Sequence, residues 1–244
     1  MTRAPDLDRH CGPAAVAAVF ARRPQDVMRL FHTQDRRRDA GPHCAALARL
    51  RRPYREVLPA DLARIAGTQH HGGIVALALP RAVAPLDPGD PPPALRAARV
   101  TPVLDGIGNP HNLGAIARSA AFFGCRGLVL SGDPRQAGLS DAAFRTSEGG
   151  LEALEVFRAA DLPAVLRAVV PRMLPVAAVP RGGVPPREVP RDVPLLLVLG
   201  NEEDGLTPAT LAACPVRVTL PAAGPVESLN VSVAAAVLIH ALAG

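Results

Sequence analysis

The spacing of apolar residues divides the chain into a regular rear part and a less regular front part. In residues 100–244, five short apolar runs bounded by Gly or Pro are typical of buried strands, namely VTPVLDGI, GLVLSG, MLPVAAV, PLLLVLG and VRVTLP. Helical patterns separate most of these runs, at residues 112–123, 162–169, 207–213 and 229–242. Strands that alternate with helices predict an α/β fold whose parallel sheet is covered on both faces.

The front part is predicted to be a smaller, compact α/β or mostly α unit. Its patterns predict helices at residues 12–21, 24–31, 44–50 and 59–66, and a strand at residues 74–79. Closely spaced prolines between residues 80 and 99 exclude a regular helix or a central strand there. We therefore expect a front domain at residues 1–82, a Pro-rich linker at 83–99 and a second domain at 100–244.

Composition excludes several classes of protein. The apolar content of 48% is enough for a real core, but the longest apolar runs fall short of the ~18 to 20 residues that a membrane span needs. The first residues lack the pattern of a secretory signal, so we expect a cytoplasmic protein. Cys11, Cys44, Cys125 and Cys214 form no CxxC pair, and we expect neither a disulfide framework nor a metal site.

Positive charge is concentrated in the front part. All 27 basic residues are arginine; residues 1–99 carry a net charge of +7 and residues 100–244 a net charge of −2. Such asymmetry favours a module that binds a polyanion, because several arginines can contact successive phosphates. A solvated arginine face explains the same charge equally well.

Three loops follow predicted strands of the rear part, where ligands bind in parallel sheets. They are DGIGNPHNLGAIAR, LGNEEDGL and LPAAGPVESLNVSV. Each has a simpler explanation: Asn112 can cap a helix, Glu202 can lie in a solvated acidic turn, and Ser228 or Asn230 can cap the last helix. That last helix is apolar nearly all round, which predicts burial in this subunit or against a second one.

Arg118 lies in a predicted helix that is largely apolar. None of the residues three or four positions away is acidic, so it has no partner within the helix. An unpaired buried cation is costly, and its side chain must reach water, a distant carboxylate or a ligand. On this ground alone, a tertiary salt bridge is favoured over a catalytic role.

Taken together, the three loops resemble a known family. The segments VLDGIGNPHNLGAIARSAAFFG, LVLGNEEDGL and LPAAGPVESLNVSVA are similar, in order, to the three motifs of the SpoU/TrmH-type RNA ribose methyltransferases. The front part resembles the substrate-binding domain of that family, itself similar to a ribosomal RNA-binding protein. The resemblance implies a SPOUT domain, in which a parallel sheet carries a trefoil knot, and a homodimer.

The same resemblance implies S-adenosylmethionine as cofactor and transfer of its methyl group to a ribose 2′-hydroxyl of RNA, with ribosomal RNA favoured over transfer RNA. The expected active-site residues are Asn112, Arg118, Glu202, Ser228 and Asn230. The expected cofactor-binding residues are Leu199, Gly200, Asn201, Leu220, Pro221 and Leu229. Because a guanidinium is effectively never deprotonated, we expect the arginine to act electrostatically on a phosphate and the developing alkoxide.

Two other functions stay open. Where the family has Gly after Glu202, this chain has Glu203 and Asp204, and the added negative charge leaves room for a dimeric RNA-binding or assembly factor without activity. A nucleotide-binding oxidoreductase or hydrolase has only the turn at Gly106 and Gly108 in its favour, because the GxGxxG pattern is absent.

Overall fold

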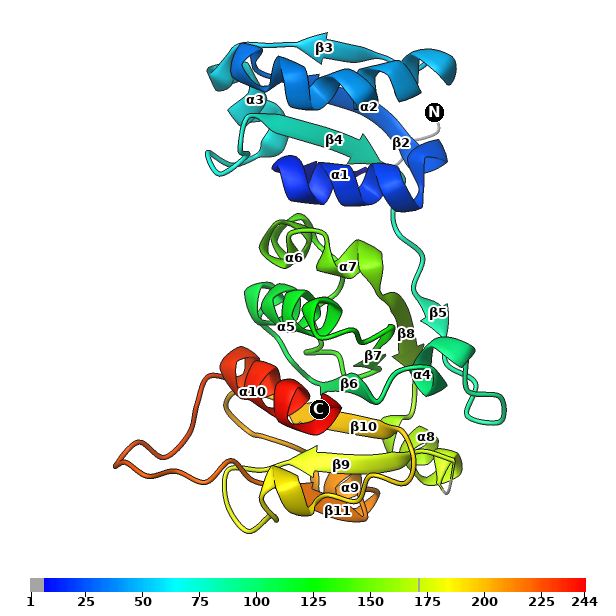
Figure 1. Cartoon of the computed structure of the whole chain (residues 1–244), viewed down its shortest axis with the longest axis vertical. Coiled ribbons are helices and arrows are strands. Elements are labelled where there is room, and N and C mark those ends of the chain that lie inside the picture. The colour runs from blue at the N-terminus through cyan, green and yellow to red at the C-terminus, as the bar shows by residue number, and fades with distance from the viewer. Residues whose placement is uncertain (1–6, 171) are drawn as a thin grey trace.

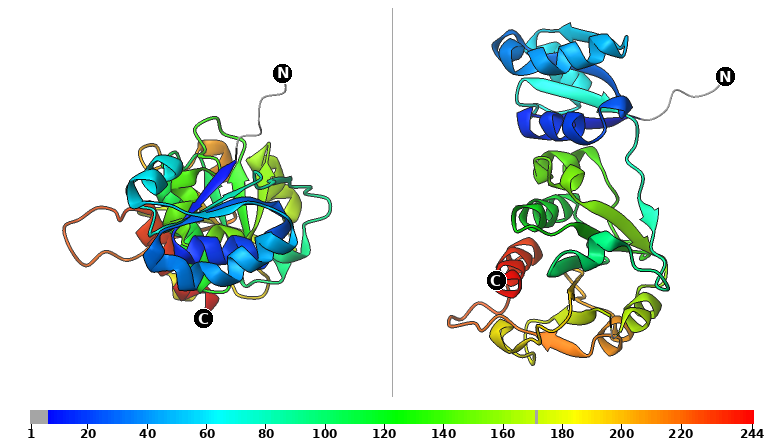
Figure 2. Two further views of the ribbon diagram at one scale, coloured as in Figure 1. Left: turned by 90° about the horizontal axis from the view of Figure 1, so that it is seen from above. Right: turned by 45° about the vertical axis from the view of Figure 1, so that its right-hand side comes forward.

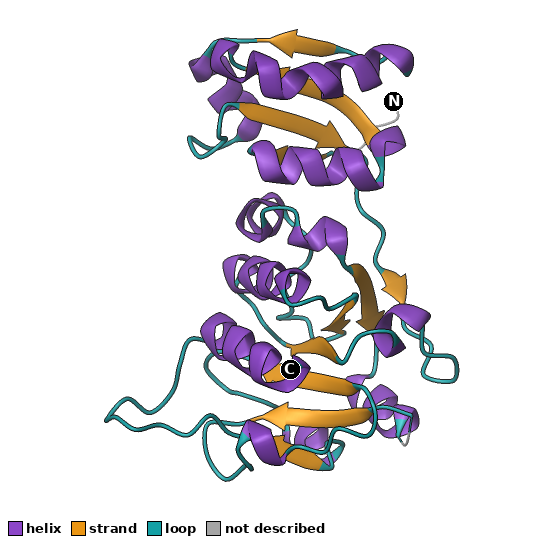
Figure 3. Ribbon diagram, in the orientation of Figure 1, coloured by secondary structure: helices purple, strands orange, loops and turns teal. Residues whose placement is uncertain are grey.

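The described residues of the protein form two β-sheets, each with its own helices, stacked along the long axis of the molecule (Figures 1 and 3). The computed structural model describes residues 7–170 and 172–244. The first sheet has four strands in the order β1-β4-β2-β3, and the second has seven in the order β11-β9-β10-β6-β7-β8-β5. Within the described residues, no helix is long and apolar enough to cross a membrane.

The first sheet is formed by the front part of the chain. Its elements are β1 (Asp8–Cys11), α1 (Pro13–Arg22), η1 (Pro24–Asp26), β2 (Val27–His32), η2 (Gln34–Arg36), α2 (Arg37–Arg49), β3 (Tyr54–Glu56), α3 (Pro59–Ala66) and β4 (Ile74–Ala78). Strand β4 is antiparallel to β1 and β2, and β3 runs parallel to β2 at the edge. Helices α1 and α2 cover one face through Val19 and Leu47, and α3 covers the other through Leu62.

The predicted helix at residues 24–31 is wrong, because most of this segment is strand β2. Pro24 opens a single 3-10 turn, and the strand begins at Val27. Val27 and Leu30 are both fully buried, and the register of β2 shifts between Val27 and Arg29. This irregularity breaks the alternation of buried and exposed residues. The buried Val27 and Leu30 are therefore three residues apart, a spacing typical of a helix.

The second sheet confirms the predicted parallel arrangement, since each of its strand pairs is parallel. Its elements are β5 (Ala84–Pro85), α4 (Pro93–Arg96), β6 (Val100–Asp105), α5 (Pro110–Phe122), β7 (Gly127–Ser131), α6 (Asp141–Ser147), α7 (Gly150–Ala153), β8 (Glu155–Ala159), α8 (Leu162–Val169), β9 (Leu174–Ala178), η3 (Pro186–Glu188), β10 (Leu195–Gly200), α9 (Pro208–Ala212), β11 (Val216–Val218) and α10 (Val231–Ala243). Helices α5, α6, α7 and α10 pack on one face, and α8 with α4 packs on the other. Strands β6 and β7 are therefore buried at every residue.

The segment predicted as a Pro-rich linker contributes an edge strand and one helical turn. Strand β5 pairs with β8 through Ala84 and Pro85 at the edge of the sheet, where proline is tolerated. The prediction that prolines exclude a helix here is wrong for α4. Pro92 and Pro93 stand at the start of α4, and the first N–H groups of a helix have no partner within it, so proline is compatible with that position.

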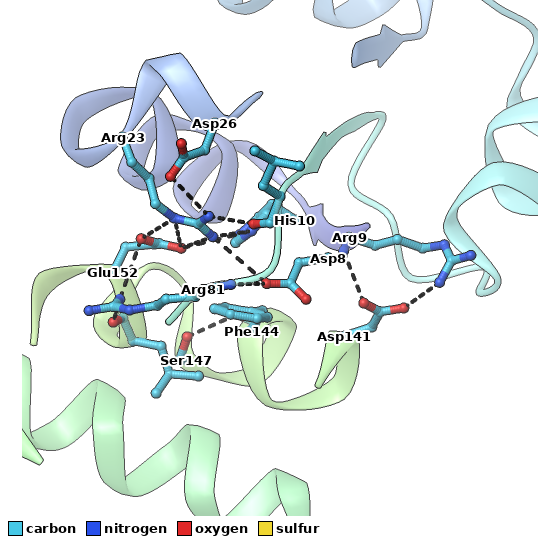
Figure 4. A network of polar contacts seen from close by, with 12 residues as sticks. Asp8, Arg9, His10, Arg23, Asp26, Arg81, Asp141, Phe144, Ser147 and Glu152 are labelled. Atoms are coloured by element: carbon cyan, nitrogen blue, oxygen red, sulfur yellow. Dashed lines mark hydrogen bonds and ion pairs between the residues drawn. The ribbon is translucent and has the colours of Figure 1, made fainter. Parts of the chain in front are cut away.

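A buried ion network fixes the first sheet and its helices to α7 (Figure 4). The Glu152 side chain, only 2% exposed, accepts a hydrogen bond of 2.9 Å from Arg23 Nη2, and Arg81 Nη1 lies 3.4 Å from its other oxygen. Burial alone raises the pKa of Glu152, but the hydrogen bonds from Arg23 and the charges of both arginines outweigh it and lower the pKa. At the rim of this interface, Arg9 pairs with Asp141 at 2.7 Å.

His10 is buried within the same interface. Its Nε2 lies 3.3 Å from Arg23 Nη2 and 3.8 Å from a Glu152 oxygen, and its ring packs on Phe144 at a centroid distance of 4.5 Å. Its Nδ1 has no hydrogen-bond partner among the described residues. Burial lowers the pKa of His10 to about 4, although the carboxylate of Glu152 opposes this shift. The imidazole is therefore neutral at pH 7 in the folded protein.

We predict that acid destabilises the protein partly through His10. Between its unfolded pKa of about 6.5 and its folded pKa of about 4, the unfolded chain binds a proton that the folded one does not, so stability falls as the pH falls. The expected contribution is about 2 kcal/mol at pH 5. Urea unfolding at pH 7 and at pH 5 measures it, and His10→Gln should reduce the difference. Substitution of the exposed His70 by Gln is the control, and an unchanged pH dependence in His10→Gln would contradict the prediction.

Candidate active site

The turn that follows β10 has a shape fixed by its own hydrogen bonds. Asn201 and Gly205 exchange two backbone hydrogen bonds of 3.0 Å, and Asn201 Oδ1 accepts from two N–H groups inside the turn. A Cβ on Gly200 would lie 2.4 Å from the carbonyl carbon of Gly205, so only glycine fits there. Asn201 Nδ2 also donates to the carbonyl of Gly106 at 2.7 Å. The loops after β6 and β10 are thus joined directly.

Three of the five expected active-site residues converge at this edge of the sheet. Asn112 Nδ2 donates to Glu202 Oε1 at 2.7 Å, and Asn230 Nδ2 donates to Asn112 Oδ1 at 3.2 Å. The Oδ1 atom of Asn230 accepts from the backbone N–H of Ser232 at 2.9 Å, which leaves its amide group to donate. These three side chains, hereafter the amide cluster, come from α5, the turn after β10 and the start of α10.

Asn112 does not cap α5, contrary to one interpretation of its sequence. Asn109 is the N-cap residue, because its Oδ1 accepts from the backbone N–H of His111 at 2.8 Å. The helix begins at Pro110, two residues earlier than the pattern predicts. Asn112 therefore lies within the first turn of α5, and its buried side chain is free to join the amide cluster. Asn230, in contrast, does cap α10.

Arg118 lies outside the amide cluster. Its Nη1 is 3.0 Å from an oxygen of Glu148, and the two side chains are 56% and 53% exposed. Six residues separate Arg118 from Asn112 along α5, which places them on different sides of the helix. The sequence favoured a tertiary ion pair for Arg118 without identifying the partner. The structure shows that the partner is Glu148 and that the guanidinium lies at the surface.

A cavity of about 390 Å³ lies beside the loops after β9 and β11. It is lined by Pro180, Arg181, Gly182, Thr219, Leu220, Ala222, Gly224, Pro225, Val226 and Glu227. Thr219 holds two of these segments together, since its Oγ1 donates to Val179 O at 3.0 Å and accepts from Gly183 N at 2.9 Å. Figure 2 shows the segment between β11 and α10 extending away from the body of the molecule.

Among the six residues expected to bind a cofactor, only Leu220 lines this cavity. Leu199 is buried in the core, and Gly200 and Asn201 form the turn after β10. Leu229 is 51% exposed, and Pro221 and Ser228 are exposed on the projecting segment. Sequence reasoning missed residues 180–182, although they follow strand β9 at the same edge of the sheet and include the first glycine of the pair at 182–183. Ligands bind beyond the carboxyl ends of the strands in parallel sheets, and this rule also predicts residues 180–182 as part of a site.

The acidic residues after Glu202 have a counter-ion that the sequence did not reveal. Arg135 lies 2.6 Å from Asp204 and 2.9 Å from Asp133. Its hydrogen bonds lower the pKa of the partly buried Asp133. Arg135 thus offsets one of the two added negative charges, and Glu203 stays exposed.

Apolar side chains are exposed just before α10, along α10 and at the end of α5. Leu229, Val233 and Val237, spaced by four residues, are 51%, 48% and 44% exposed, and Phe122 is 83% exposed. We call these four residues the apolar stripe. The other side of α10 is buried on the sheet through Ala235, Leu238, Ile239 and Leu242.

No group of three His, Cys, Asp or Glu side chains within the described part of the chain is placed to hold a metal ion. The four cysteines are free thiols, and burial raises the pKa of Cys11 and Cys125 to about 11.

Comparison with known proteins gives matches over both parts of the chain. A model of the SpoU rRNA Methylase family matches residues 99–240, and a model described as RNA 2'-O ribose methyltransferase substrate binding matches residues 11–82. An uncharacterized tRNA/rRNA methyltransferase of Mycobacterium ulcerans is 38% identical over 197 residues, which are 78% of this chain and 62% of that protein. The chain spans about three fifths of the length of the curated relatives it matches.

Solved structures share the fold. The rRNA methyltransferase from Sinorhizobium meliloti with bound AdoMet has a TM-score of 0.78 at 22% identity, and the match covers 97% of this chain and 87% of that one. The SpoU methyltransferase AviRb from Streptomyces viridochromogenes, in complex with AdoMet, has a TM-score of 0.74 at 24% identity. The match covers 98% of this chain and 89% of that one. At these identities the likeness is one of fold.

We predict that two substitutions of Asn230 separate its structural role from its place in the amide cluster. Asn230→Ala removes the cap and should destabilise the protein by about 1 kcal/mol, which lowers the melting temperature by about 2 to 4 °C. Asn230→Asp keeps an oxygen for the N–H of Ser232 and should retain stability, but it cannot donate to Asn112. Thermal unfolding checks both variants. An equal loss of stability in Asn230→Asp would show that the bond to Asn112 contributes to the fold.

Proposed function

Because the chain belongs to the SpoU rRNA methylase family, we propose that it transfers the methyl group of S-adenosylmethionine to a ribose 2′-hydroxyl of RNA. The observation that carries this proposal is the convergence of Asn112, Glu202 and Asn230 at the carboxyl edge of a parallel sheet. That edge is where ligands bind in folds of this type. The AdoMet complexes of two proteins with the same fold support the choice of cofactor.

The cavity beside the loops after β9 and β11 fits the proposed cofactor. Its volume of about 390 Å³ lies within the usual range of small-molecule sites. Gly182 and Gly224 line its wall without side chains, and the carboxylate of Glu227, which pairs with Arg181 at 3.0 Å, would turn to a ligand with a positive sulfonium and amino group. Leu220 would pack on the ligand, while the turn at Gly200 and Asn201 would hold the neighbouring loops in place. The cofactor supplies an electrophilic methyl group that needs no metal.

Arg118 would act on the RNA. A guanidinium keeps its proton, so it serves as a fixed positive charge for a phosphate and for the developing charge on the 2′-oxygen. Its half-exposed side chain is open to RNA, which would replace Glu148 as its partner. Asn112, Asn230 and Ser228 would orient the ribose and the surrounding loops through hydrogen bonds. Fixed dipoles and charges of this kind lower the barrier because they need no reorganisation during the reaction.

A homodimer would bring Arg118 and the cavity together across two subunits. Within one chain, Arg118 is outside the amide cluster, and the apolar stripe on α10 and α5 is exposed. Contiguous exposed apolar side chains are typical of association surfaces. Pairing of two apolar stripes around a two-fold axis would bury them and place α5 of one subunit beside the loops of the other. The trefoil knot remains a prediction from the family.

Structured RNA is the proposed substrate, with ribosomal RNA favoured over transfer RNA. The net charge of +7 in residues 1–99 supports RNA binding by the front part. The match of residues 11–82 to a substrate-binding model supports the same role. A dimeric RNA-binding factor without activity is the second candidate, and the ion pair between Arg118 and Glu148 favours it, because that contact occupies the guanidinium.

We predict that Arg118→Ala lowers methyl transfer to total ribosomal RNA at least 100-fold, because one positioned charge at a reacting centre contributes on that order. Cofactor affinity by calorimetry and the melting temperature should stay near wild type. Glu148→Gln is the matched control, since it breaks the same ion pair but keeps the guanidinium, and it should retain activity. Absence of cofactor binding by the wild-type protein would refute the enzyme proposal. Equal losses of stability in both variants, with activity retained, would support a structural ion pair.

We also predict that Val233→Glu converts a dimer into a monomer. The side chain is 48% exposed in the single chain, so the substitution should leave the fold intact while placing two carboxylates within the apolar stripe of the dimer. Sedimentation velocity measures the change in mass. Leu58→Glu, at an apolar residue of the front part that is 71% exposed, is the control and should leave the mass unchanged. A wild-type protein that sediments as a monomer would rule out the dimer.

A further inference from the structure

Strand β3 lies at the end of the molecule remote from the second sheet (Figures 1 and 2), and exposed arginines occur along β3 and the C-terminal turn of α2. All residues of β3 are exposed, and its outer edge has no partner strand among the described residues. Arg49, Arg51, Tyr54 and Arg55 lie together along this short stretch of chain, and we call these four residues the β3 edge. Tyr54 is 47% exposed.

The backbone at Arg51 is strained. Helix α2 ends with hydrogen bonds from Arg51 N to Ala48 O at 3.0 Å and from Arg52 N to Leu47 O at 2.9 Å. This is the Schellman pattern, in which the residue at the position of Arg51 adopts a left-handed conformation and is usually glycine. Arg51 has a φ of 53°, and the only other non-glycine residue with positive φ in the described chain is Glu148. A left-handed conformation costs a non-glycine residue free energy, which makes the Arg51 side chain a candidate for a function.

The three arginines of the β3 edge have no ion pair or hydrogen bond of their side chains to another described residue. Neighbouring arginines differ: Arg52 donates to the carbonyls of Gln25 and Val27, and Arg64 pairs with Asp61. The positive charges of the β3 edge are therefore available to an external anion. Successive guanidinium groups along an edge match the repeated phosphates of a nucleic-acid strand.

Tyr54 adds an exposed aromatic ring to the β3 edge, on the face of the sheet opposite to Arg55, its neighbour in the strand. Its partner across the ladder, Leu30, is fully buried, whereas Tyr54 stands at the outer edge of the sheet with half of its side chain open. It is the single tyrosine of a chain without tryptophan. Unpaired bases stack on exposed aromatic rings of this kind while the backbone follows nearby positive charges. A duplex, whose base faces are covered, cannot use such a ring.

We propose that the β3 edge binds an unpaired segment of the substrate RNA, with one base stacked on Tyr54 and adjacent phosphates on Arg51 and its neighbours. The inference rests on the proposed function only in taking RNA as the substrate. It places an RNA contact at the far end of the front part, away from the amide cluster. A strand of another chain added to the open edge is the competing occupant.

The test measures binding of total ribosomal RNA to the full chain over a series of salt concentrations. Tyr54→Ala should weaken binding about tenfold and leave the salt slope unchanged, because stacking involves no counter-ion release. Arg51→Gly should weaken binding and reduce the slope of log K against log salt by about 0.7, the value for one contact to a single strand. Its melting temperature should not fall, because glycine adopts the left-handed conformation freely.

Arg64→Ala is the matched control, since it removes one exposed positive charge from α3 of the same part of the chain. It should leave both affinity and salt slope near wild type. Variants of Tyr54 and Arg51 that bind as tightly as Arg64→Ala overturn the proposal. So does a wild-type protein whose mass rises through pairing at β3 and falls in Tyr54→Ala.

A direct readout uses the single tyrosine. Protein labelled with 3-fluorotyrosine gives one ¹⁹F resonance, from Tyr54. Oligoadenylate RNA should shift this resonance, and inorganic polyphosphate, which carries charge without bases, should not. If both ligands shift the resonance equally, base stacking on Tyr54 is refuted. The same holds if the RNA binds and the resonance does not move. If these results hold but the protein neither binds S-adenosylmethionine nor methylates RNA, the proposed function fails and the RNA contact stands.

Discussion

The parallel direction of all seven strands in the second sheet is the constraint on which the rest of the structure depends. Each strand must end at the same edge, so loops that are far apart in the sequence are brought together there. Asn112 and Asn230 are separated by 118 residues and still share a hydrogen bond. Strands buried on both faces leave no space within the sheet, so the polar side chains of the candidate site gather at this edge.

The elements with strong patterns were predictable from the sequence. The runs at β6, β7, β9 and β10 are apolar at nearly every position because both faces are covered, and this is a pattern that a single sequence displays clearly. Strand β2 was not predictable, because an irregular register gave Val27 and Leu30 the spacing of a helix. The short strands β3 and β5 owe their existence to pairing with distant segments, which no local pattern records.

The candidate site, like the fold, was predictable from the sequence only in part. The loops that carry Asn112, Glu202 and Asn230 were found from their position after strands, whereas the hydrogen bonds that join them depend on three-dimensional placement. Glu148 and Arg135 could not be found as partners of Arg118 and Asp204, because 30 and 69 residues separate the pairs. Long-range ion pairs of this kind leave no spacing in the sequence that identifies them.

The interface between the two parts of the chain is held by arginine side chains, which differ from lysine in proton affinity and in the number of acceptors they can bind. Arg81 donates to the carbonyls of Leu151 and Leu154 as well as facing Glu152. Burial lowers the pKa of Arg81, but a guanidinium begins so high that it keeps its proton, whereas a lysine in the same place would be open to neutralisation. Its planar fork also serves several acceptors at once, which one ammonium cannot do in the same geometry. In this chain without lysine, the positive charge of Arg81 therefore persists at pH values at which a buried ammonium group would lose its proton.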